Sequence, residues 1–322
     1  MQDETSNPTQ NYGGLPWTFA RRSGWPIAAI LCAVCLWGGS FAAMRSALQV
    51  LDPWSVMWLR MAIALLFLLP LAGRLRRLPY RHGDWKMLTA MVLFQPCLYF
   101  LLESHALGLT TSSQAGVISA SVPLMVTIGA CWLLAEPVGR KSFLGLLLSM
   151  AGVAGLTLMQ SEHGQAANPY LGNLMELGAM ACAAANMLAI KKLSQRYNAW
   201  TLTALQVAAG AIFFLPGLWF LARDTGLRVT GDLVRTLIFL GFFVTLGAFG
   251  LYNWGMSRIP AGRASIFINL VPVIAVFIGW LALNETLTPG QWIAAATVII
   301  GVWVSQRTDH RSDGSGKPSA AR

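Results

Sequence analysis

Charged residues are scarce in this chain. Asp, Glu, Lys and Arg make up 11% of its 322 residues, whereas 55% are apolar. In soluble globular proteins about 25% of residues are charged, so this composition excludes a soluble protein and predicts an integral membrane protein. The apolar runs are continuous and do not alternate with polar residues as the strands of an outer-membrane barrel do. We therefore expect an all-α membrane protein.

The motifs of catalysis, metal binding and nucleic-acid binding are also missing. There is no His-Glu-x-x-His, no Gly-x-Ser-x-Gly and no phosphate loop, so we expect no enzyme, no cofactor and no metal site. The net charge of +10 is spread between apolar segments, which argues against a nucleic-acid partner. All five cysteines lie in apolar runs, where a thiol usually acts as a small hydrophobe.

Ten apolar runs are each close to the 20 or so residues with which a helix crosses roughly 30 Å of hydrocarbon. They lie near residues 25–45, 53–72, 85–107, 112–135, 142–160, 170–190, 200–221, 233–254, 264–283 and 289–306. This spacing predicts a first five-helix repeat at 25–160 and a second at 170–306, joined by a polar linker at 161–169. Residues 1–24 are polar and show no signal peptide, and the tail 307–322 has the composition of a disordered segment.

Parts of the chain repeat at an offset of 149 residues. Ala115, Pro123, Glu136 and Gly152 return as Ala264, Pro272, Glu285 and Gly301. Two copies with an odd number of spans insert in opposite orientations, as the inverted repeats of many transporters do. The sequence therefore predicts ten transmembrane helices in two inverted five-helix repeats, and a carrier. In this topology 18 of the 23 Lys and Arg residues fall on the side of the termini, so both termini should be cytoplasmic.

Pro123 and Pro272 lie near the middle of the fourth and ninth predicted helices, where proline breaks a backbone hydrogen bond and predicts a kink. Ser119, Ser121 and Asn269 are close by and could line a substrate cavity, although a simple packing kink is the alternative. Glu136 and Glu285 follow the same two helices. We expect these two carboxylates to be structural caps for the amino end of the next helix rather than substrate ligands.

Few ionisable residues lie within the spans. A charge at the centre of a membrane helix costs about 2.5–3.5 kcal/mol, so Arg60, Glu103 and Glu176 should face the interior of the bundle. We interpret the two glutamates as candidates for proton coupling and Arg60 as their counter-charge. The alternative is that Glu103, together with His105, reaches the headgroups and water at the end of its helix.

The remaining candidates for substrate binding are polar residues on one face of helix six and aromatic residues of other helices. They are Asn173, Glu176 and Asn186 on helix six, and Trp37, Tyr99 and Tyr252 elsewhere.

Several motifs match one group of membrane carriers. They are Trp37-Gly38-Gly39-Ser40, Pro53 with Leu59-Arg60, the stretch from Ala115 through Pro123 to Glu136, and its copy from Ala264 through Pro272 to Glu285, then Gly301. In this combination the chain resembles the EamA type of the drug/metabolite transporter superfamily over most of its length. The resemblance implies ten helices, a bacterial inner-membrane location and outward transport of small metabolites. It also implies that helices one, three, four, six, eight and nine surround the substrate path.

The resemblance also bears on the substrate. Sugar-phosphate carriers of similar fold hold phosphate with basic residues, including some on the ninth helix, but residues 264–283 contain no Lys or Arg. We therefore expect export of amino acids or related amphipathic compounds by alternating access. A passive facilitator or channel for small neutral or zwitterionic solutes is the alternative. The expected partners are a small-molecule substrate and membrane lipid, and the oligomeric state stays open, a homodimer included.

Overall fold

The computed structural model describes residues 24–48, 50–71, 80–109, 118–159, 168–223, 229–283 and 288–306, and every regular element in these ranges is a helix. The α-helices are α2 (Trp25–Leu48), α3 (Pro53–Leu68), α5 (Asp84–Val92), α6 (Tyr99–Leu109), α8 (Val122–Leu133), α9 (Arg140–Leu158), α10 (Pro169–Leu193), α11 (Ala199–Phe213), α12 (Pro216–Arg223), α13 (Gly231–Ile238), α14 (Phe249–Met256), α15 (Ala261–Ile266), α16 (Leu270–Leu283) and α17 (Pro289–Gln306). Four short 3-10 or π-helical segments continue them: η1 (Leu69–Leu71), η2 (Leu93–Leu98), η3 (Phe239–Ala248) and η4 (Phe267–Asn269). The predicted helical class is confirmed.

Three helical stretches of the described ranges are long and apolar enough to cross a membrane, at Asp84–Ala106, Tyr170–Leu193 and Gly231–Met256. A fourth is added if α11 and α12, which meet at a 50° bend, count as one span. Shorter apolar helices cover Trp25–Ser40, Pro53–Leu68, Val122–Leu133 and Ala261–Ile274. Helices thus lie over the described part of every predicted span, while the number that crosses the bilayer stays a prediction.

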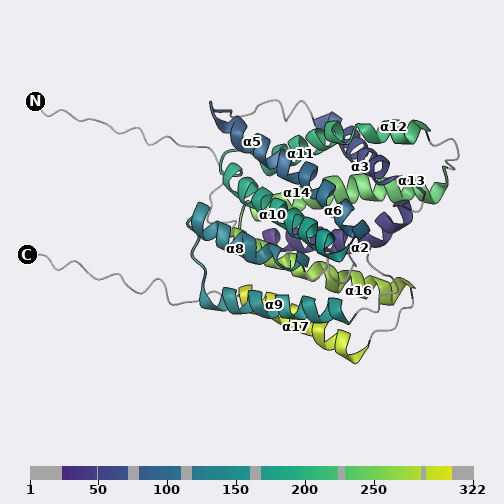
Figure 1. Cartoon of the computed structure of the whole chain (residues 1–322). Helices are drawn as coiled ribbons and strands as arrows, with labels where there is room; N and C mark the ends of the chain where they lie inside the picture. Colours follow the sequence, from purple (N-terminus) through teal and green to yellow (C-terminus); the bar gives the residue numbers. More distant parts are fainter. Residues whose placement is uncertain are drawn as a thin grey trace, which may run out of the picture.

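The helices pack side by side as a bundle (Figure 1). At one end of it Arg196, just after α10, reaches Asp84 at the start of α5 (N–O distance 2.6 Å), and Lys191 in the last turn of α10 lies 3.9 Å from the carboxylate of Glu136, which follows α8. We call this the cationic end. Cations that the sequence assigns to the side of the termini therefore meet in space.

The pair α9 and α17 lies at one edge of the bundle (Figure 1), and small residues let the two backbones approach closely. A Cβ atom added at Gly152 would lie 2.7 Å from the backbone nitrogen of Val298, and one added at Gly301 would lie 2.4 Å from that of Ser149. The two contacts are equivalent under the offset of 149 residues, because Gly152 corresponds to Gly301 and Ser149 corresponds to Val298. The two repeated segments therefore meet through equivalent contacts.

Each of the two repeated prolines, where a kink is predicted, follows directly on an interruption of regular α-helix. Pro123 is in the first turn of α8, directly after a turn at residues 120–121, and Pro272 is in the first turn of α16, directly after the 3-10 turn η4. The first turn is where a helix tolerates proline best, because the N–H that proline lacks would have no helical acceptor there.

Candidate functional site

Two of the long helices lose regular geometry near the middle of the bundle. Gln95, in η2, has extended backbone angles (φ −146°, ψ 124°) because the ring of Pro96 disfavours a helical conformation for the residue before it. In η3 the backbone is π-helical, and the hydroxyl of Thr245 donates to the carbonyl of Leu240, five residues earlier, at 2.8 Å. Irregular backbone at this depth needs polar partners from the protein.

Buried amides supply those partners. The side-chain nitrogen of Gln206 in α11 donates to the freed carbonyl of Gln95 (3.1 Å) and to the side-chain oxygen of Asn186 in α10 (3.0 Å). Asn186 donates to the side-chain oxygen of Gln95 (2.7 Å), and Asn253 in α14 donates to Gln206 (3.0 Å) and Thr203 (2.9 Å). All five residues are buried. This amide network connects four helices and leaves few polar groups unpaired.

A small cavity lies beside the amide network, between Gln95, Gln206, Thr245 and Phe249. Its volume of about 10 Å³ is close to the space needed for one water molecule. The network therefore stabilises the broken backbone rather than enclosing a space for an organic substrate.

Arg60 is a buried cation on α3, with 6% of its surface exposed. Its Nε donates to the hydroxyl of Thr245 at 3.2 Å, and its guanidinium carbon lies 5.6 Å from the centre of the Phe100 ring. Among the ion pairs of the described residues none joins Arg60 to a carboxylate within 4 Å. Nη1 of Arg60 also lies 3.7 Å from the sulfur atoms of Met44 and Met57. Thr245, these two sulfur atoms and the Phe100 ring are thus the groups that contact Arg60 directly, and its role as a counter-charge to the glutamates stays a prediction.

Two carboxylates lie on the neighbouring helices α6 and α10. Glu103 on α6 accepts a hydrogen bond from the hydroxyl of Tyr99, one turn earlier, at 2.6 Å. Glu176 on α10 is 3% exposed, and its Oε2 has no hydrogen-bond partner among the described residues. Glu103 interacts electrostatically with Arg60 and with Glu176. Arg60 and Glu176 are buried, and Tyr99 and Glu103 are half-buried. We call these four residues the buried charge cluster.

Aromatic rings extend from the buried charge cluster towards α14. The ring of Phe100 packs against Tyr99 (centroid distance 5.1 Å) and against Phe249 (6.4 Å), and Phe249 packs against Trp37 of α2 (5.5 Å). Trp37 also contacts the ring of Tyr252 at 5.0 Å. The structure therefore brings the predicted aromatic residues Trp37, Tyr99 and Tyr252 into one continuous wall next to the charges.

Other predicted binding residues lie elsewhere. Asn186 belongs to the amide network, and Asn269 in η4 donates to the hydroxyl of Ser149 in α9 at 2.8 Å, so its visible partner is a packing contact. Ser119 is half-buried just before the turn that precedes α8, and the hydroxyl of Ser121 in that turn is buried without a partner. Asn173 is half-buried on α10. The hydrogen bonds of the Asn186 and Asn269 side chains among the described residues thus join groups outside the buried charge cluster.

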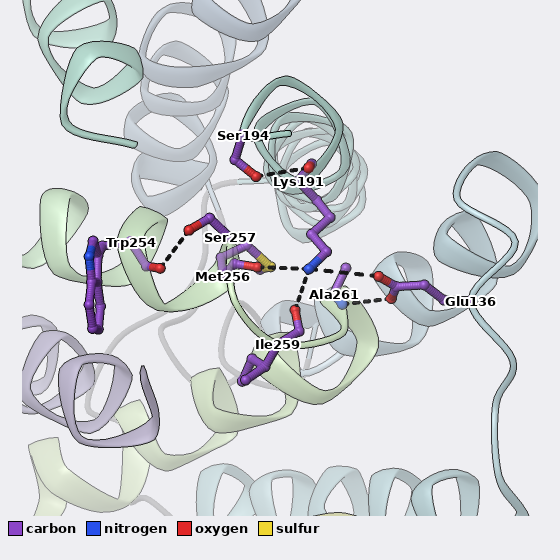
Figure 2. Close-up of polar contacts among 8 residues, drawn as sticks. All are labelled: Glu136, Lys191, Ser194, Trp254, Met256, Ser257, Ile259 and Ala261. Carbon is purple, nitrogen blue, oxygen red and sulfur yellow. Dashed lines mark hydrogen bonds and ion pairs between the residues drawn. The ribbon is translucent and has the colours of Figure 1, made fainter. Parts of the chain in front are cut away.

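The predicted cap Glu136 serves a different helix from the expected one. Its carboxylate accepts a hydrogen bond from the backbone N–H of Ala261, the first residue of α15, at 2.7 Å (Figure 2). The expected target was the next helix, α9, but the amino end of α15 presents its free N–H to Glu136 and is 125 residues away in the chain. Glu285 lies outside the described residues.

A buried cluster of charges beside an aromatic wall, in a bundle of apolar helices, is the arrangement of a membrane transporter. The sequence model of the EamA-like transporter family matches the chain twice, over residues 24–158 and 170–306. The chain therefore belongs to the EamA-like transporter family and is a multi-pass membrane protein.

Two similar proteins of Bacillus subtilis are also described as transporters. The chain is 29% identical over 292 residues to "Uncharacterized transporter YcxC" of Bacillus subtilis (strain 168), covering 86% of this chain and 90% of that protein. It is 29% identical over 220 residues to "Uncharacterized transporter YetK" of the same organism, covering 67% of this chain and 65% of that protein. A solved crystal structure superposes with a TM-score of 0.72 at 18% identity, over 87% of this chain and 96% of that chain, which shows a shared fold.

Proposed function

We propose that this chain exports small amphipathic metabolites, amino acids among them, across the bacterial inner membrane by alternating access. The transporter consists of ten membrane helices in two inverted five-helix repeats, and both of its termini are in the cytosol. The substrate binds between the buried charge cluster and the aromatic wall. Glu176 carries the coupling proton or contacts the ammonium group of the substrate, and Arg60 provides the balancing positive charge.

The packing of α9 against α17 supports the inverted repeat. Because Gly152 meets Val298 as Gly301 meets Ser149, a two-fold operation would exchange the two helices. Helix ends support the inversion as well, since the segment that ends α8 lies beside the start of α15. These contacts favour opposite directions for the equivalent helices of the two copies. The cations at the cationic end support a cytosolic position for that end.

The observation that carries the proposal is the buried carboxylate of Glu176. An unpartnered carboxylate oxygen in the core costs about 1–3 kcal/mol or more, and such intramembrane carboxylates mark substrate or proton pathways. A buried carboxylate with this energetic cost is explained if a partner binds to it during the transport cycle. A proton or a substrate ammonium group is such a partner.

Transport by the purified protein in proteoliposomes tests the proposal. A panel of labelled amino acids and amphipathic amines is measured with and without an imposed proton gradient. Saturable transport by the wild type and a loss of at least ten-fold in Glu176→Gln are expected, because the amide can neither release a proton nor pair with an ammonium ion. Asp232→Asn is the matched control, since Asp232 is an exposed carboxylate on α13 that pairs only with Arg235 among the described residues.

Two results would contradict the proposal in different ways. Full transport by Glu176→Gln would remove Glu176 from the mechanism. Flux through the wild type that does not saturate and ignores the proton gradient would favour a passive facilitator.

A further inference from the structure

Lys191 binds the turn between α14 and α15 at the cationic end. We call this turn the α14–α15 corner. The Nζ atom of Lys191 donates to the backbone carbonyls of Met256 (3.2 Å) and Ile259 (2.6 Å), at the end of α14 and in the turn that follows it (Figure 2). A cation is stabilising at this place because the last carbonyls of a helix carry partial negative charge and have no helical donor. The side chain of Lys191 is only 17% exposed.

Glu136 binds the α15 side of the same corner. Its Oε2 accepts from the N–H of Ala261, where α15 begins, and its Oε1 lies 3.9 Å from Nζ of Lys191. An anion is stabilising at the amino end of a helix for the converse reason. Lys191 and Glu136 thus neutralise the two helix ends that meet at the corner between α14 and α15, and they attract each other across it.

The elements that meet here come from both halves of the chain. Glu136 follows α8 in the first repeat, whereas Lys191 and the corner are in the second. A second pair, Arg196 with Asp84, closes the same end, and Tyr197 donates to Asp84 at 2.8 Å. Burial and the hydrogen bond to Asp84 raise the pKa of Tyr197. Of the ion pairs among the described residues, the two that join different helices both lie at the cationic end.

We propose that Lys191 and Glu136 form the cytosolic gate of the transport path. When the two halves rock, this end can open only if Glu136 separates from Ala261 and Lys191. The gate is closed in the structure. This inference rests on the proposed alternating access, and Lys191 is a positioning residue that does not touch the substrate.

Cysteine labelling from the cytosolic side tests the gate. Ser265 is fully buried on α15, four residues after Ala261 and therefore on the same helix face. In a chain without its native cysteines, Ser265→Cys is treated with a membrane-impermeant thiol reagent in inside-out vesicles. Adding Lys191→Met should raise the labelling rate about ten-fold, which corresponds to a shift of about 1.4 kcal/mol in the opening equilibrium.

Two matched controls separate gate opening from general loosening. Ser305 is also fully buried at the cationic end, but it lies on α17 where Ser142 donates to its carbonyl, so the labelling of Ser305→Cys should not change. Lys192 is the exposed neighbour of Lys191, and Lys192→Met should leave Ser265→Cys as slow as before. Glu136→Gln should act in the same direction as Lys191→Met, and it serves if the lysine variant does not fold.

The outcomes distinguish the gate from the function on which it rests. Equal acceleration at Ser265→Cys and Ser305→Cys, or no acceleration at Ser265→Cys in folded Lys191→Met and Glu136→Gln, would overturn the gate. The labelling needs no substrate. A wild type that transports nothing in proteoliposomes would therefore refute the proposed function without deciding how this end opens.

Discussion

The close contact between α9 and α17 makes the effect of one added methyl group predictable. In Gly301→Ala the new Cβ would lie 2.4 Å from the backbone nitrogen of Ser149 and 2.8 Å from the carbonyl oxygen of Gly145. Ordinary contacts of a Cβ begin near 3.4 Å, so the helices must separate by about 1 Å. Overpacking costs about 1–3 kcal/mol, and the upper figure applies because both obstacles are backbone atoms that no rotamer change can move.

Gly155→Ala is the matched control on the same pair of helices. Its added Cβ would lie 3.5 Å from the Cβ of Ala294, which is an ordinary contact. Replacing a helical glycine by alanine stabilises by about 0.5–1 kcal/mol. This gain applies to both variants, so their free energies of unfolding should differ by roughly 3 kcal/mol, the overpacking cost of Gly301→Ala. Thermal unfolding of the purified variants in one detergent measures the difference. Equal midpoints for Gly301→Ala and the wild type would refute the close approach of α9 and α17.

Two further substitutions probe the interior. Glu176→Met removes a buried carboxylate oxygen without a partner among the described residues, and it should raise the free energy of unfolding by about 1–3 kcal/mol while abolishing transport. Thermal unfolding and proteoliposome transport measure the two effects, and a less stable, active variant would contradict the proposed site. Asn253→Leu leaves the side-chain oxygen of Gln206 without its donor and should lower the unfolding free energy by about 1–3 kcal/mol; an unchanged thermal midpoint would show that the amide network contributes no stability.

The residues of the buried charge cluster could be found from the sequence because a charge stands out against an apolar run. Arg60, Glu103 and Glu176 are costly in lipid, so the cost itself predicts that they face inward. The sequence could not predict that Arg60 would bond to Thr245 and not to a carboxylate within 4 Å. That choice depends on the distance between α3 and η3, which only packing fixes.

The amide network was missed for a different reason. Gln95, Gln206 and Asn253 are uncharged and isolated in apolar runs, so each alone indicates no more than a tolerated polar residue. The hydrogen bond between Gln206 and the Gln95 carbonyl also joins positions 111 residues apart, which the sequence does not reveal. Pro96 was the available signal, because a proline inside a predicted span forces the preceding residue out of the helix. The predicted helix breaks are those at the repeated Pro123 and Pro272, and not the one at Pro96.

The positions of the charges along α10 connect the gate to the site. Glu176 is the eighth residue of α10 and Lys191 follows it by 15 residues, which is about 22 Å at 1.5 Å per residue. Glu176 is therefore only about 10 Å from the opposite end of its helix. Under the proposed mechanism, a closed cationic end and charges placed nearer the other end favour a site that opens to the outside. A chain in which Glu176→Cys is the only change should then react faster with a thiol reagent added outside than with one added from the cytosol. Adding Lys191→Met to that chain should reverse the preference.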